Sequence, residues 1–225
     1  MALRKISRAG FALILLLLAG CAVQTAPRWR LTADSELQLL ATALLEGQER
    51  QAAWRLSEAV RAATATAQPE AVGRVWLYAC AIATARLDNT LCSRYAAMPQ
   101  TDQPESHRSY YAFLQGKWAD VAVATLPVVY HSVVTAKDSA SREAAVAVIA
   151  DPQSRLIAAA ACVEAGQCGQ GGVNVAVDTA SAQGWRGALY PWLLRQRDEL
   201  LQGGDTVGAH KVQARIDLLR ATSGK

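Results

Sequence analysis

Apolar residues recur at helical spacing along most of this chain. In the first such segment they are Leu37, Leu40, Ala41, Leu44 and Leu45, three or four positions apart, as on one side of an amphipathic helix. Alanine and leucine favour helix over strand, and a sustained alternation of apolar and polar residues, which is typical of strands, is hard to find. The pattern therefore predicts an all-α fold.

The first two predicted helices form a pair. Asp34 or Ser35 is expected to cap the first helix, and Gly47 ends it before a second apolar side begins. Small, apolar and turn residues stand at Leu39, Leu40, Ala43, Gly47, Ala52, Leu56 and Ala59. In these positions the pair resembles a tetratricopeptide (TPR) unit. The resemblance implies two antiparallel helices that approach closely at alanines.

Two later turns resemble the same family, at Gly116 between aromatic residues and at Gly203-Gly204-Asp205, and the resemblance implies a helix on each side of both turns. Their spacing is irregular, which indicates a degenerate array without a tidy 34-residue period. A single hairpin cannot bury its apolar side, so we expect the hairpins of residues 34–225 to stack as a TPR-like superhelix. Pro127 departs from the pattern because proline kinks or ends a helix, and residues 128–134 are locally β-branched.

Other helix boundaries follow from capping residues. Pro69 suits a first helical turn, and the helix that it begins is followed by a turn and a partner helix over 90–98. Asp138 or Ser139 is expected to cap the helix that continues to Ala150, and Asp151-Pro152 begins the next.

The chain begins with the three parts of a secretory signal peptide. Arg4, Lys5 and Arg8 form a basic segment, residues 9–18 form an apolar core without charge, and small residues surround Cys21. The apolar run is too short for a membrane-spanning helix, which needs about 20 residues.

Leu18-Ala19-Gly20-Cys21 resembles the lipobox of bacterial lipoproteins. The resemblance implies cleavage after residues 1–20, acylation of Cys21 and insertion of its acyl chains into membrane lipid, with residues 21–33 as a tether. In that family an aspartate directly after the cysteine commonly retains the protein at the inner membrane. This chain has Ala22 there, so the resemblance implies that the protein is anchored in the outer membrane and faces the periplasm. The alternative is an ordinary signal peptide that is cut after Ala22, with loss of Cys21.

The charge of the chain lies mostly in this leader. The formal charge is +4 from 23 basic and 19 acidic residues, and removal of the three leader cations leaves 20 against 19, or +1. A body so close to neutrality gives no electrostatic case for nucleic acid as a partner.

The five cysteines suggest two disulfides. The lipid takes Cys21, and an even number in an oxidising compartment indicates two bonds among three possible connectivities. We expect local pairing, Cys80 with Cys92 and Cys162 with Cys168, because a predicted turn lies between the members of each pair.

Motifs for chemistry are missing from the sequence. His107, His131 and His210 lie far apart, without a second ligand at metal spacing, and no Gly-x-Ser-x-Gly, phosphate loop or His-Glu-x-x-His occurs. We therefore predict no catalytic, metal or cofactor-binding residue and no enzyme. The six tryptophans are expected in the core, with the lining of a ligand groove as the alternative.

Together these features predict an outer-membrane lipoprotein that binds a periplasmic or outer-membrane protein. By resemblance to anchored TPR lipoproteins, it would act as an interaction or assembly module, for example in secretion or pilus machinery. The alternatives are an enzyme or enzyme regulator that acts on peptidoglycan, and a structural envelope lipoprotein without a selective groove.

Overall fold

The structure is a computed structural model that describes residues 26–221. The predicted signal peptide, the lipobox and Cys21 lie outside the described residues. Within 26–221 the chain forms helices and no strand, which confirms the all-α prediction. The α-helices are α2 (Arg28–Glu46), α3 (Glu49–Thr64), α4 (Pro69–Thr84), α5 (Cys92–Ala96), α6 (Glu105–Leu114), α7 (His131–Thr135), α8 (Ser139–Ala147), α9 (Pro152–Glu164), α10 (Gln170–Ala182), α11 (Arg186–Gln202) and α12 (Thr206–Ala221).

The first helix begins earlier than the sequence predicts. It starts at Arg28, and Asp34, the expected cap, lies inside it. Ala33 is fully buried and Trp29 packs against the core, so burial extends the helix toward the N-terminus past a usable cap. Only residues 21–27 of the predicted tether therefore precede the helix.

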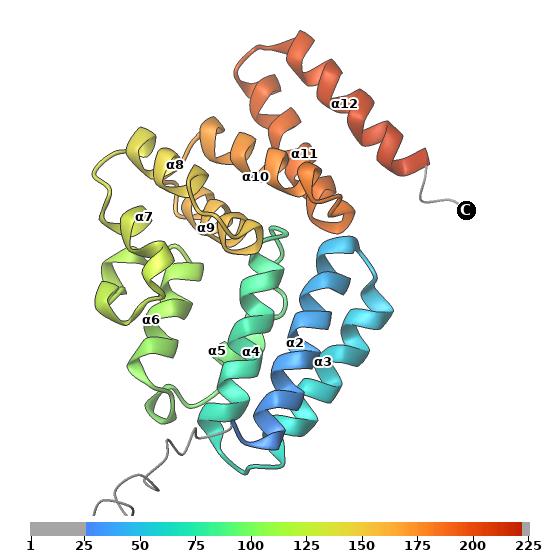
Figure 1. The fold of residues 1–225 in the computed structure, drawn as a ribbon. Coiled ribbons are helices and arrows are strands. Elements are labelled where there is room, and N and C mark those ends of the chain that lie inside the picture. The colour runs from blue at the N-terminus through green and yellow to red at the C-terminus, as the bar shows by residue number, and fades with distance from the viewer. Residues whose placement is uncertain (1–25, 222–225) are drawn as a thin grey trace, which may run out of the picture.

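The predicted turn after this helix is present. Gly47 adopts the left-handed conformation at φ 82°, where glycine has no steric cost, and its N–H donates to the carbonyl of Leu44. The chain then reverses into α3, and α4 follows with Pro69 in its first turn. Helices α2, α3 and α4 lie side by side (Figure 1).

Between α6 and α7, the helix that the TPR resemblance implies after Gly116 is absent. Three short 3-10 turns replace it, at Trp118–Asp120, Val123–Thr125 and Val128–Tyr130, with Pro127 directly before the last. Aromatic rings hold this segment against α6, since the centroids of Phe113 and Tyr130 are 4.9 Å apart. Stacked rings supply the contacts that a regular helix would otherwise make.

The caps of α8 and α9 are confirmed. The carboxylate of Asp138 accepts the N–H of Ser141 at 2.7 Å, and that of Asp151 accepts the N–H of Ser154 at 2.7 Å. Helix α8 ends at Ala147, three residues before the predicted Ala150.

The C-terminal helices return to the N-terminal ones. Helix α11 contacts α2 across most of the described chain, and α9 contacts α4 (Figure 1). In a solenoid each repeat contacts only its neighbours. The described contacts thus join helices that a linear array would separate, and they do not confirm the predicted TPR-like superhelix.

Candidate functional site

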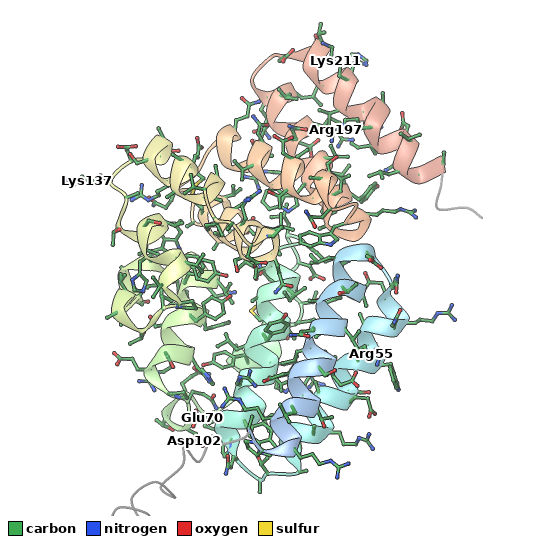
Figure 2. The ribbon with its side chains drawn as sticks, viewed as in Figure 1. Arg55, Glu70, Asp102, Lys137, Arg197 and Lys211 are labelled. Carbon is green, nitrogen blue, oxygen red and sulfur yellow. A yellow bond between two sulfur atoms is a disulfide. The ribbon has the colours of Figure 1, made fainter. Side chains whose placement is uncertain are left out.

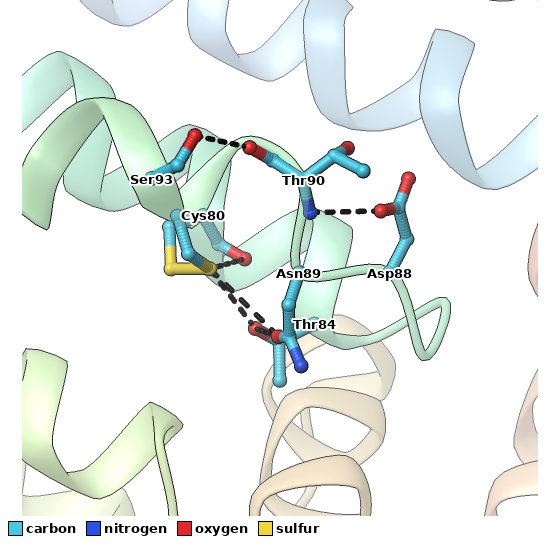
Figure 3. The surroundings of a disulfide bond; sticks show 7 residues. Cys80, Thr84, Asp88, Asn89, Thr90 and Ser93 are labelled. Atoms are coloured by element: carbon cyan, nitrogen blue, oxygen red, sulfur yellow. Dashed lines mark hydrogen bonds between the residues drawn. A yellow bond between two sulfur atoms is a disulfide. The ribbon is translucent and has the colours of Figure 1, made fainter.

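The predicted disulfide between Cys80 and Cys92 is present in the structure. It joins the C-terminal part of α4 to the first residue of α5, with the two sulfurs 2.08 Å apart (Figure 3). The turn between them is shaped by Asp88, whose carboxylate accepts the N–H of Thr90 at 2.9 Å. The bond therefore fixes a short helix directly against α4.

The predicted disulfide between Cys162 and Cys168 is also present, with a sulfur separation of 1.97 Å. It closes the end of α9 across Gly166, which adopts a φ of 65°. All four cysteines are buried in these bonds, so their role in the described fold is to hold two turns.

A long apolar groove runs along α3, and we call it the α3 groove. Its volume is about 790 Å³, within the range of binding pockets. Helix α3 supplies one wall, α4 contributes Trp76, and the segment held by the first disulfide contributes the rest. The lining residues are Ala53, Leu56, Ser57, Val60, Arg61, Thr64, Ala65, Trp76, Leu91 and Arg94.

Helical spacing explains why α3 has a second apolar side. Ala52, Ala59 and Ala63 are buried against the neighbouring helices, whereas Ala53 and Val60 lie on the adjoining side and line the groove. Ala53 is exposed and Val60 is half-buried. The groove is therefore an apolar helix side that no element among residues 26–221 covers.

The charged residues of the lining are both arginines. Arg61 forms an ion pair with Glu58, which does not line the groove. Arg94 has no ion pair among the described residues, and its guanidinium carbon lies 5.3 Å from the centroid of the Trp76 ring. The lining thus combines apolar surface with cationic charge at its edge.

A further tryptophan stands beside the groove. Trp54 is 53% exposed, and it precedes Ser57 and Arg61 by three and seven residues on the same helix. Arg55, labelled on α3 in Figure 2, pairs with Glu36 of α2 at 3.1 Å and has its guanidinium carbon 4.3 Å from the Trp54 ring centroid. An exposed aromatic side chain next to an apolar groove is a feature of binding surfaces.

The tryptophans divide between the two predicted roles. Trp192 is fully buried in the core, as expected, and Trp118 stacks on Phe113, whereas Trp76 lines the groove. The helical spacing of Ala53, Val60 and Thr64 could have indicated this surface from the sequence. The contribution of Arg94 could not be found there, because the disulfide fixes the short helix α5 that carries it.

Other functional features are few in the described chain. Residues 26–221 hold no group of three or more histidines, cysteines or carboxylates that is arranged to bind a metal. None of the helices described there is both long enough and apolar enough to cross a membrane. A ring nitrogen of His107 lies 3.4 Å from the side-chain oxygen of Gln103, and a ring nitrogen of His131 lies 3.0 Å from the carbonyl oxygen of Leu126. Each ring is therefore hydrogen-bonded to a residue close to it in the sequence.

No protein-family model, no curated protein and no solved structure matches this chain. Function is therefore inferred from the residues of the leader and of the α3 groove.

Proposed function

We propose that this chain is a lipoprotein of the outer membrane, anchored through acylated Cys21 and facing the periplasm, which binds an envelope protein in the α3 groove. The observation that carries the partner-binding part is the uncovered apolar side of α3 with Trp76 opposite it. The lipobox at Leu18–Cys21 carries the anchoring part.

Two features support the compartment. Disulfides persist in oxidising compartments such as the periplasm, and two pairs of cysteines lie at bonding distance in this fold. Ala22, in place of aspartate, favours the outer membrane by resemblance to the lipoprotein family.

The proposed occupant is an amphipathic helix of a partner protein that carries carboxylates beside its apolar face. From Ala53 to Thr64 the groove follows eleven helical steps, or about 17 Å, which matches three turns of a docked helix. Arg61 and Arg94 at the edge complement acidic side chains, and no carboxylate lines the groove.

The anchor would hold this groove near the membrane. Residues 21–27 precede α2, and seven residues span at most about 25 Å. The partner is accordingly a periplasmic or outer-membrane protein. By binding this partner, the chain would act as an interaction or assembly module, as TPR-like helical hairpins do.

Metabolic labelling tests the anchor. Labelled palmitate is expected to enter the wild-type chain in cells and to be absent from Cys21→Ser, since only a thiol can take the thioether-linked lipid. Equal labelling of the two proteins would remove the basis for anchoring.

Site-specific photocrosslinking in cells tests the groove. A photoreactive residue at Thr64, an exposed lining position, is expected to capture an envelope protein, whereas one at Lys211 of α12 is not (Figure 2). Ala53→Glu places a carboxylate in the apolar lining and should abolish capture. Gln51→Glu adds the same charge on another side of α3 and should preserve it.

Two outcomes would contradict the partner-binding proposal. One is the same capture in Ala53→Glu and in wild type. The other is turnover of peptidoglycan fragments by the purified chain, which would assign it to the enzyme alternative.

A further inference from the structure

A second cavity, of about 530 Å³, lies where the C-terminal end of α2 meets α11 and α12. We call it the arginine cavity. Its charged and hydroxyl-bearing lining residues are Glu46, Glu49, Arg86, Arg186, Tyr190 and Arg220. The arginines come from positions far apart in the sequence, and they share a cavity because α11 packs against α2 and α12 packs on α11 (Figure 1).

The cations of this cavity are incompletely compensated. Glu49 pairs with Arg86 at 2.6 Å. Glu46 accepts a hydrogen bond from the Gln48 amide, which does not line the cavity. Arg186 and Arg220 form no ion pair among the described residues.

Both of these guanidiniums donate to uncharged oxygens. Arg186 donates to the carbonyl of Leu219 at 3.3 Å, and Arg220 donates to the Tyr190 hydroxyl at 2.7 Å. Each guanidinium has five N–H donors, so donors remain for a ligand.

The backbone adds to the positive potential. Arg186 and Gly187 are the first residues of α11, so the positive end of the helix dipole lies at the cavity. A Cβ on Gly187 would lie 2.4 Å from the Gly47 nitrogen, so glycine is what allows this turn to sit against the end of α2. The Nε of Arg86 is buried and has no hydrogen-bond acceptor among residues 26–221.

We propose that the arginine cavity binds the phosphoryl group of a small phosphate ester through Arg86, Arg186 and Arg220. A phosphate monoester carries close to two negative charges at pH 7 and several acceptor oxygens, so it can accept from more than one guanidinium fork. The volume exceeds that of a bare phosphate ion and lies in the range of small-molecule sites, which leaves room for the esterified group.

The position of the cavity favours a soluble ligand over a lipid headgroup. It lies at the C-terminal end of α2, whose 19 residues span about 28 Å from Arg28. The predicted anchor is at the opposite end of that helix. The inference does not depend on the α3 groove or on its partner.

Titration calorimetry of the full-length chain in detergent and phosphate-free buffer tests this site. Glycerol 3-phosphate and inorganic phosphate are expected to bind, the ester more tightly. Arg186→Gln and Arg220→Gln should each weaken binding about tenfold or more, because each removes charge-assisted hydrogen bonds. Arg220 is exposed, so its variant should melt at the wild-type temperature.

The matched control is Arg215→Gln, which removes an exposed arginine of the same helix that does not line the cavity. It should leave affinity unchanged.

Flotation with phosphatidylcholine vesicles, with and without phosphatidic acid, distinguishes the source of the phosphoryl group. If the chain bound phosphatidic acid but neither soluble probe, and this binding were lost in Arg220→Gln, the site would still bind a phosphoryl group and its ligand would be a lipid headgroup. The proposal would be overturned if glycerol 3-phosphate, inorganic phosphate and phosphatidic acid all failed to bind, or if wild type and Arg220→Gln bound with equal affinity.

Discussion

The indole N–H of Trp192 donates a hydrogen bond to the carbonyl oxygen of Ala85 at 2.8 Å. Both residues are fully buried, and they are 107 positions apart in the sequence. The bond joins α11 to the end of α4 and so connects the C-terminal helices to the N-terminal three. It is a polar contact inside an apolar core, where an unpaired carbonyl is costly.

We predict that Trp192→Phe destabilises the chain by roughly 1–3 kcal/mol, because it leaves a cavity and an unpaired Ala85 carbonyl. Urea unfolding monitored by circular dichroism measures this loss. The control is Trp54→Phe, at a side chain 53% exposed, which should change the free energy of unfolding by less than about 0.5 kcal/mol. Equal effects of the two changes would show that the Trp192 contact does not support the fold.

The two disulfides should contribute unequally to stability. They close loops with sequence separations of 12 and 6 residues, for which the loop-entropy relation gives about 3 and about 2 kcal/mol. Replacing both cysteines of one pair by alanine and comparing melting temperatures measures each contribution. The Cys80–Cys92 variant is expected to melt lower, and the reverse order would contradict the entropic explanation.

Gly187→Ala should be strongly destabilising. Its Cβ would lie 2.4 Å from the Gly47 nitrogen and 2.6 Å from the Leu44 carbonyl oxygen, and backbone atoms cannot move aside as a flexible side chain can. Overpacking of this kind typically costs about 1–3 kcal/mol. Gly203→Ala is the control, since Gly203 adopts right-handed helical angles and its nearest atom would be 3.4 Å away. Thermal melts that lower both variants equally would refute the close-approach explanation.

Stability should fall when the pH falls below about 6.5, the usual pKa of histidine. Burial, and to a smaller extent Arg74, lowers the pKa of His107, although Glu70 opposes this. The unfolded chain then binds a proton at a higher pH than the folded chain, so protonation favours unfolding until the pH passes below the folded pKa. Urea midpoints between pH 8 and pH 5 measure the slope.

His107→Gln should reduce that slope, while His210→Gln, at an exposed position of α12, should leave it as in wild type. A slope that is unchanged in His107→Gln would assign the pH dependence to other groups.

Local signals predicted much of the fold. Asp138 and Asp151 could be identified as caps because a side-chain oxygen and a backbone N–H three residues later meet within one turn. The pairing of Cys80 with Cys92 could be predicted for the same reason, since a short turn limits the partners that either cysteine can reach. Glycine turns such as Gly47 depend only on local dihedral angles.

The errors arose where tertiary contacts override local preference. Asp34 is a good cap, yet burial of Ala33 continues the helix through it. The helix expected after Gly116 gives way to short turns because Tyr130 stacks on Phe113 and Pro127 interrupts the backbone.

Local spacing was enough to predict the all-helical class, two caps and both disulfide pairings, since each depends on residues within a few turns of one another. The tertiary structure decided which apolar side of α3 stays uncovered and which arginines share a cavity. Arg86 and Arg220 line one cavity because α11 packs against α2 and carries α12 with it. That return is set by the combined burial of side chains such as Trp192 and Leu193. Burial depends on the whole packed core, and no window of sequence contains it.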